Sequence, residues 1–170
     1  KLKSKKNIFI WDDCENKRKE LEKKGYEFNE PRKWPWEKID LLISSPGIAL
    51  NFGADSFIIK ESKKNKIKVV GDLEVFYQEL KSLGIRKKII AVTGTNGKST
   101  FVSVLNEILQ KSGLKSSIAG NIGIPVLSIN ADEFDIIILE VSSFQLELID
   151  QFRADISVIL NVHEDHNERY

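Results

Sequence analysis

The sequence contains no methionine and only one cysteine, Cys14. A single cysteine cannot form an internal disulfide, so a disulfide-stabilised scaffold is excluded and a reducing compartment, the cytoplasm, is expected. No stretch approaches the ~20 apolar residues that a membrane-spanning helix needs. No signal peptide opens the chain either. Because a natural start residue is missing, we expect the 170 residues to be an excerpt that is complete at neither end.

An excess of charge of either sign is also lacking. The 26 basic residues nearly balance the 25 acidic ones, which leaves a formal net charge of +1. No broad electrostatic field is therefore present to attract nucleic acid or a membrane surface, and we expect neither as a partner. The overall composition is typical of a globular protein that is long enough to bury a substantial core.

The most informative stretch is residues 89–100, an apolar run that turns at glycines and continues with a helical pattern. Gly94 and Gly97 allow backbone torsions with which successive N–H groups can face an anion. Lys98 adds a mobile positive charge, and the following helix offers the positive end of its dipole. A hydroxyl of Ser99 or Thr100 is placed to ligate Mg²⁺. The predicted phosphate-binding loop comprises Gly94, Thr95, Asn96, Gly97, Lys98, Ser99 and Thr100.

This loop departs from the common G-x-x-x-x-G-K-[ST] pattern, because the first glycine would fall at Val92. We interpret it as a shortened variant. The alternative is a plain glycine turn with an exposed lysine. The apolar strand before the loop and the amphipathic helix after it favour phosphate binding.

Strand and helix patterns alternate along the whole chain, which predicts an α/β fold with parallel sheets. We place a domain boundary in the basic link that ends at Lys88, giving a Rossmann-like domain over residues 1–86 and a P-loop-type domain over residues 87–170. An apolar helix face is predicted over residues 72–83, with Asp72 capping its start. Strands are expected at residues 7–11, 39–44, 67–70, 116–119, 135–141 and 156–160, and the last two read as strands buried on both faces.

Polar residues follow several of these strands. Glu140 ends a buried apolar run, where an acid can hold Mg²⁺ directly or through water; a strand-end capping glutamate is the alternative. Two histidines and two acids lie within residues 163–166, but a zinc site is less favoured than magnesium in a P-loop sheet. Residues 45–47 follow a predicted parallel strand, at the edge where open α/β sheets bind ligands, although a plain turn would read the same way.

Several blocks together resemble the Mur ligase family, in the family's order. The phosphate loop over residues 93–100 is similar to the family's ATP loop, and residues 140–147, with the sequence EVSSFQLE, resemble the D-glutamate-adding branch. The loop alone would also admit folylpolyglutamate synthase, whereas the second block is more selective. Further similar blocks are residues 45–50, 70–74, 120–123 and 161–166.

The resemblance implies a UDP-sugar-binding Rossmann-like domain, here lacking its first strand and glycine turn, followed by an incomplete central ATP-binding domain. The implied reaction joins D-glutamate to UDP-N-acetylmuramoyl-L-alanine in cytoplasmic peptidoglycan precursor synthesis. ATP first converts the substrate carboxylate into an acyl phosphate, which the amine of D-glutamate attacks. The implied cofactors are ATP and Mg²⁺, and the implied full enzyme is monomeric.

The resemblance also implies roles for individual residues. Lys98, Glu140 and His166 would be catalytic: Lys98 on the ATP phosphates, Ser99 and Glu140 on one Mg²⁺, and His166 on a second. The residues implied to bind the UDP-linked substrate are Ser45, Pro46, Gly47, Asn121, Ser142 and Gln145.

Two departures limit what these residues are expected to do by themselves. The family's carbamylated lysine and its third domain would lie beyond Tyr170, so we expect little or no ligase activity from this chain. The alternatives are a nucleotide-binding module or degraded homologue without ligase activity, and a related amide ligase of folate metabolism. A dinucleotide-dependent oxidoreductase would need a G-x-G-x-x-G turn upstream and leaves Gly97-Lys98-Ser99 unexplained.

Overall fold

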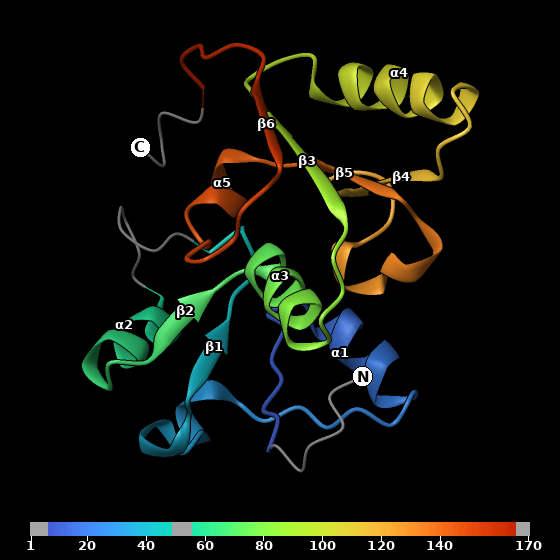
Figure 1. The fold of residues 1–170 in the computed structure, drawn as a ribbon. Helices are drawn as coiled ribbons and strands as arrows, with labels where there is room; N and C mark the ends of the chain where they lie inside the picture. The colour runs from blue at the N-terminus through green and yellow to red at the C-terminus, as the bar shows by residue number, and fades with distance from the viewer. Residues whose placement is uncertain (1–6, 49–55, 166–170) are drawn as a thin grey trace.

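The computed structural model describes residues 7–48 and 56–165 (Figure 1). Its strands form two separate parallel sheets, which confirms the predicted α/β class. The helices are α1 (Glu15–Glu22), α2 (Phe57–Lys64), α3 (Asp72–Ser82), α4 (Lys98–Lys111) and α5 (Ser143–Leu146). The strands are β1 (Leu41–Ile43), β2 (Lys68–Val70), β3 (Lys88–Thr93), β4 (Ser116–Gly120), β5 (Ile136–Glu140) and β6 (Ile156–Ile159). Short 3₁₀ turns are η1 (Pro31–Lys33), η2 (Trp36–Lys38), η3 (Val126–Ser128) and η4 (Ala131–Glu133).

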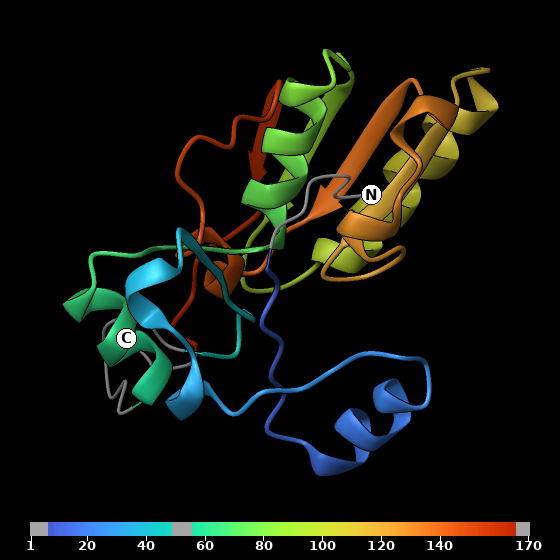
Figure 2. The same cartoon turned by 90° about the horizontal axis from the view of Figure 1, so that it is seen from below.

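The larger sheet has the strand order β4-β5-β3-β6 and is covered on both faces. Side chains alternate along its strands, so Ile89 and Leu139 pack with α3 while Val92 and Ile138 pack with α4. Figure 2 shows α3 and α4 on opposite sides of this sheet. Burial of each such aliphatic side chain contributes about 1.5–3 kcal/mol, so these two layers stabilise the framework that carries the phosphate loop.

The prediction that two strands are buried on both faces is right for β5 and wrong for β6. The β5 side chains Ile137, Ile138 and Leu139 are fully buried. In contrast, Ile156 is 55% exposed and Ile159 is 69% exposed, because β6 lies at the edge of the sheet in the described part of the chain. A continuous apolar run therefore does not distinguish a central strand from an edge strand.

The smaller sheet pairs β1 with β2 in parallel, with Leu41 opposite Lys68. Its core is a cluster made by Trp34, Trp36, Leu42, Ile59 and Ile67. The strand expected at residues 7–11 is wrong: these residues form no strand, although Phe9 and Trp11 do pack against this cluster. Helix α1 buries none of its residues.

Helix α3 packs against the larger sheet, although it belongs to the predicted first domain. Three of its apolar side chains, Leu73, Phe76 and Leu80, lie in one cluster with residues of β3, β4 and β5. The backbone N–H of Gly71, just before the helix, donates to the Leu148 carbonyl at 2.9 Å. The division between residues 86 and 87 stays a prediction.

Asp72 does not cap α3 as the sequence predicted. Gly71 occupies the N-cap position and makes no side-chain cap, while Asp72 is the first helical residue. Its carboxylate accepts the backbone N–H of the next residue, Leu73, at 3.0 Å and also accepts hydrogen bonds from the Gln145 side-chain amide at 3.2 and 3.3 Å. None of the helices in the described ranges is long and apolar enough to cross a membrane.

Candidate functional site

The predicted phosphate-binding loop lies between β3 and α4, where the sequence placed it. Gly94 has φ +143° and Gly97, the N-cap of α4, has φ +83°, both in the region that favours glycine. A Cβ on Gly94 would lie 3.1 Å from the Asn161 carbonyl oxygen and 3.2 Å from its nitrogen. The loop therefore needs glycine at this position for both its torsion and its space.

Lys98 begins α4 and is folded back over the loop. Its ammonium group donates to the carbonyl oxygens of Gly94 and Thr95, the latter at 3.1 Å. The side chains of Ser99 and Thr100 follow in the first helical turn and are exposed. The positive end of the α4 dipole, the Lys98 ammonium group and two exposed hydroxyls are thus all at the start of α4, which suits a polyphosphate.

Glu140 ends β5 beside the phosphate loop, because it is in register with Val92 of the neighbouring strand β3. Its side chain is only 1% exposed. One carboxylate oxygen, Oε1, accepts a hydrogen bond from Asn121 Nδ2 at 2.8 Å. The other, Oε2, is the buried side-chain atom without a partner in the described part of the molecule. A buried carboxylate oxygen normally needs a partner, so the site fits a divalent cation.

Asn121 was predicted to contact the substrate and in this structure holds Glu140. Besides the side-chain bond, its backbone N–H donates to the Glu140 carbonyl oxygen at 2.9 Å. Asn121 is itself exposed, so its remaining polar atoms stay accessible from solvent.

Ser142 and Gln145 form a reciprocal capping box at the start of α5. The Ser142 backbone N–H donates to Gln145 Oε1 at 3.1 Å, and the Gln145 backbone N–H donates to the Ser142 hydroxyl at 3.3 Å. The other end of the Gln145 amide donates to Asp72. Gln145 is buried and its side chain links α3 to the segment that follows Glu140.

A second carboxylate on α3, that of Glu74, makes a further link that the sequence did not predict. Glu74 is fully buried, and its Oε2 accepts three backbone N–H groups, from Asp150 at 2.8 Å and from Gln151 and Phe152 at 2.9 Å. Burial by itself would raise the pKa of Glu74, but these donors and the Gln78 amide outweigh it and lower the pKa. The signal was available in the sequence, since Glu74 lies three residues before Tyr77 on the apolar face of the helix.

Residues 45–47 follow β1 and form a turn, with the Ile48 N–H donating to the Ser45 carbonyl at 3.0 Å. Ser45 and Gly47 are exposed and Pro46 is half-buried. The turn lies at the carboxyl end of the two parallel strands, as predicted. It belongs to the smaller sheet, whereas the phosphate loop belongs to the larger one.

His166, the predicted ligand of a second metal ion, lies outside the described residues. His163, Glu164 and Asp165, which precede it, are exposed. Among residues 7–48 and 56–165, no three histidine, cysteine, aspartate or glutamate side chains are grouped so that they could hold a metal. The described carboxylate that suits a cation is therefore Glu140, acting with loop groups and solvent.

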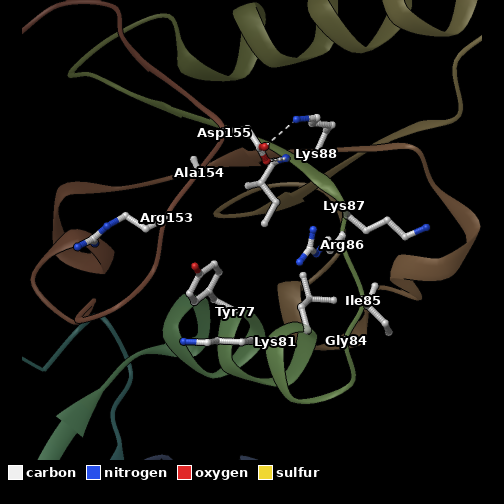
Figure 3. Close-up of a pocket in the computed structure, with 12 residues that line it drawn as sticks. Tyr77, Lys81, Gly84, Ile85, Arg86, Lys87, Lys88, Arg153, Ala154 and Asp155 are labelled. Carbon is white, nitrogen blue, oxygen red and sulfur yellow. Dashed lines mark hydrogen bonds and ion pairs between the residues drawn. The ribbon is translucent and has the colours of Figure 1, made fainter.

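A separate cavity of about 740 Å³ lies at the other end of the larger sheet, where strand β3 begins (Figure 3). It opens where β3 begins, between the end of α3 and the segment before β6, and its lining includes Lys81, Arg86 and Arg153. None of the sequence-predicted site residues lines it. The candidate functional site is therefore the edge formed by the phosphate loop, Glu140 and Asn121.

Comparisons with known proteins place the chain among its relatives. Residues 92–170 match the family model described as the Mur ligase middle domain. A UDP-N-acetylmuramoylalanine--D-glutamate ligase of Wolbachia pipientis wMel is 38% identical over 170 residues, which cover 99% of this chain and 32% of that protein. The enzyme of the same name from Rickettsia bellii is 40% identical over 172 residues, covering 99% of this chain and 36% of that protein.

A solved structure supports the fold alone. The UDP-N-acetylmuramate:L-alanyl-gamma-D-glutamyl-meso-diaminopimelate ligase from Neisseria meningitides superposes with a TM-score of 0.52 at 17% sequence identity. The match covers 95% of this chain and 54% of that protein. The chain spans about a third of the length of the curated relatives that it matches. Together, the phosphate loop, the glutamate at the end of β5 and the matches along the chain show that it belongs to the Mur ligase family.

Proposed function

We propose that this chain supplies the ATP-phosphate site, and part of the UDP-substrate site, of a ligase that adds D-glutamate to UDP-N-acetylmuramoyl-L-alanine. In such a cytoplasmic reaction of peptidoglycan precursor synthesis, the γ-phosphoryl group of ATP passes to the substrate carboxylate. The amine of D-glutamate then displaces phosphate from the acyl phosphate. The D-glutamate specificity is supported by the EVSSFQLE block at residues 140–147 and by the names of the similar proteins.

The observation that carries the proposal is the free oxygen of a buried glutamate beside a phosphate loop. Glu140 Oε2 is desolvated and has no partner in the described structure, while Asn121 holds the other oxygen. Retaining an unpaired buried carboxylate costs stability, so a ligand that satisfies it is a direct explanation. A divalent cation would fit both the charge and the donor type of this carboxylate, and it would neutralise charge on the ATP phosphates.

In this proposal the residues of the larger sheet's site have separate roles. The loop N–H groups and Lys98 would bind and orient the ATP phosphates, with Lys98 leaving the Gly94 and Thr95 carbonyl groups to do so. Ser99 and Glu140 would hold Mg²⁺, which supplies charge neutralisation for phosphoryl transfer when bound. His166 would ligate a second Mg²⁺. The reaction then depends mainly on positioning and on electrostatic stabilisation.

The UDP-linked substrate would bind between the two sheets' carboxyl edges in this proposal. Ser45, Pro46 and Gly47 offer an exposed turn at the end of β1 for the uridine diphosphate end. Asn121 would contact the muramoyl end through its exposed atoms, and Ser142 would lie near the diphosphate. Gln145 is buried and bonded to Asp72 and Ser142, so its contribution would be to shape this segment.

The experiment that tests the function measures phosphate release with ATP, Mg²⁺, UDP-N-acetylmuramoyl-L-alanine and D-glutamate. For the 170-residue chain, which spans about a third of its relatives, we expect binding of ATP and of the UDP-linked substrate but little turnover. Binding is measured by isothermal titration calorimetry with each ligand in turn. Absence of binding for both ligands would contradict the proposal, and robust phosphate release would contradict the expected inactivity.

A nucleotide-binding module without ligase chemistry is the second candidate. It is favoured by the phosphate loop itself, whose glycines, lysine and helix N-terminus bind a nucleotide phosphate whatever reaction follows. The two candidates differ in the second ligand. The ligase proposal requires binding of UDP-N-acetylmuramoyl-L-alanine at the β1 edge, whereas the nucleotide-binding module requires binding of ATP alone.

A further inference from the structure

Asn161, which follows β6, contacts the phosphate loop through both its side chain and its backbone. The Asn96 N–H donates to Asn161 Oδ1 at 2.9 Å, and Asn161 Nδ2 donates back to the Asn96 carbonyl at 3.0 Å. The Thr95 N–H donates to the Asn161 carbonyl at 3.2 Å. One carboxamide thus satisfies the donor and the acceptor of a single loop residue, which is a bidentate match.

The residues around Asn161 strengthen this link. The His163 N–H donates to the Thr95 hydroxyl at 3.0 Å, and that hydroxyl donates to the His163 carbonyl at 3.3 Å. Gly94 lies directly against the Asn161 backbone, where a Cβ would come within 3.1 Å of its oxygen. Two segments 65 residues apart in sequence are therefore held together over residues 94–96 and 161–163.

The position of Lys98 shows why this link matters for binding. In the described structure Lys98 also restrains the loop, by donating to the Gly94 and Thr95 carbonyl groups. A lysine that turns towards a phosphate gives up these bonds. The contacts from Asn161 and His163 then remain to fix the peptide groups of Thr95 and Asn96, and a loop that is already ordered pays less entropy on binding.

We propose that Asn161 is a positioning residue that holds the phosphate loop in its anion-binding shape and ties it to the segment leading to His166. The ATP part of this inference rests on the proposed function, whereas the loop-ordering part concerns the ligand-free chain. An asparagine is required because the site needs one acceptor and one donor on the same planar group. Aspartate has the same shape but offers two acceptors, so it repels the Asn96 carbonyl oxygen.

The test uses the whole 170-residue chain and two measurements on each variant. Amide hydrogen exchange followed by NMR reports the opening of the Asn96 N–H without ligand. Titration calorimetry reports the affinity for ATP in the presence of MgCl₂. For Asn161→Ala we expect exchange at Asn96 to rise about tenfold and ATP affinity to fall about tenfold, which corresponds to about 1.4 kcal/mol.

Two further variants separate positioning from general damage. Asn161→Asp keeps the shape and the acceptor, so it should fold. The Asn96 N–H should nevertheless exchange faster in this variant than in the wild type. Asn130→Ala removes an exposed asparagine whose side chain donates to Glu133, away from the phosphate loop, and it should change neither measurement. The Leu160 N–H, which donates to the Thr93 carbonyl at 3.0 Å, is an internal reporter that should stay protected in all variants.

The proposal is overturned if Asn161→Ala leaves either the Asn96 exchange rate or the ATP affinity at the wild-type value. It is also overturned if Leu160 exchanges as fast as Asn96 in both Asn161 variants, because the defect would then be general unfolding. A wild-type chain that binds no ATP would contradict the proposed function instead. In that case the Asn96 exchange rate in the ligand-free variants decides whether Asn161 orders the loop.

Discussion

Asn121 and Glu140 are joined twice, once through their side chains at 2.8 Å and once from the Asn121 N–H to the Glu140 carbonyl at 2.9 Å. The pair fixes one carboxylate oxygen and leaves the other buried without a partner in the described residues. Such an arrangement lowers stability in the ligand-free protein. Binding of a cation to the free Glu140 oxygen would explain why this arrangement is kept.

Replacing Glu140 by glutamine tests whether stability and metal binding oppose each other here. Glu140→Gln keeps an acceptor for Asn121 Nδ2 and removes a buried charge, so we expect an unchanged or higher thermal midpoint. It also removes the cation ligand, so the gain in ATP affinity on adding Mg²⁺ should fall about tenfold or more. Thermal melts and calorimetry with and without MgCl₂ measure the two effects.

The matched control for this change is Glu133→Gln, because Glu133 is exposed and bonds to Asn130. It should alter neither the melt nor the Mg²⁺ dependence. A Glu140→Gln chain with the wild-type response to Mg²⁺ would show that this carboxylate does not serve the cation.

Gly94→Ala tests the close approach of the phosphate loop to Asn161. The added Cβ would have to lie 3.1–3.2 Å from backbone atoms of Asn161 at φ +143°. We expect a loss of about 2 kcal/mol or more in unfolding free energy, from steric strain, together with a clear loss of ATP affinity. Urea unfolding and ATP titration are the measurements.

Gly113→Ala provides the comparison, since Gly113 also has a positive φ, +83°, but has nothing within 4 Å of the added Cβ. It carries the torsional cost of about 1 kcal/mol without the contact with Asn161. Equal losses of stability in the two variants, with ATP binding intact in both, would argue against a tight loop packing that matters for binding.

Glu74→Gln tests the buried carboxylate that joins α3 to residues 150–152. The neutral amide accepts the three backbone N–H groups more weakly, so the unfolding free energy at pH 7 should fall by about 2 kcal/mol. Urea unfolding monitored by circular dichroism gives this value. The exposed Glu22 on α1 is the control, and Glu22→Gln should change the free energy by less than about 0.5 kcal/mol.

The stability difference between the wild type and Glu74→Gln should also depend on pH. The folded-state pKa of Glu74 lies below its ordinary value, so the charged form contributes stability above the unfolded pKa, about 4.3. That contribution is lost as the pH falls through the folded pKa. The stability difference between wild type and Glu74→Gln should therefore be largest above about pH 5 and shrink below it. A difference that grows towards acid pH would contradict the assignment.

Local patterns in the sequence carried much of this structure. The β3-loop-α4 unit could be predicted because glycine, lysine and hydroxyl residues at this spacing are each suited to binding phosphate. The position of Glu140 at a strand end could be predicted because it follows an apolar run. Edge position could not be read in the same way, since three of the four residues of β6 are β-branched apolar residues, much as in the Ile136–Leu139 run of β5. The strand expected at residues 7–11 is wrong because an apolar segment can pack its side chains, as Phe9 and Trp11 do, without pairing its backbone with a sheet.

Hydrogen-bonded links between distant segments were beyond the reach of sequence patterns. Asn161 and Asn96 lie 65 residues apart in sequence. Glu74 accepts hydrogen bonds from Asp150 and Phe152, which lie 76 and 78 residues further along the chain. Such pairs depend on the tertiary arrangement of α3, β3 and β6 rather than on any local period. The sequence predicts Asp72 only as a helix cap for the same reason, because only the packed structure brings Gln145 to it.

The measurement that most directly tests the central proposal is calorimetric titration of ATP with MgCl₂ into wild type, Lys98→Ala and Lys111→Ala. Lys98 begins α4 beside the loop, whereas Lys111 ends the same helix in an exposed ion pair with Glu107. We predict Mg²⁺-dependent binding by wild type and Lys111→Ala, and at least a tenfold weaker affinity for Lys98→Ala. Equal affinity in all three proteins, or no binding by wild type, would contradict the assignment of this loop to the ATP phosphates.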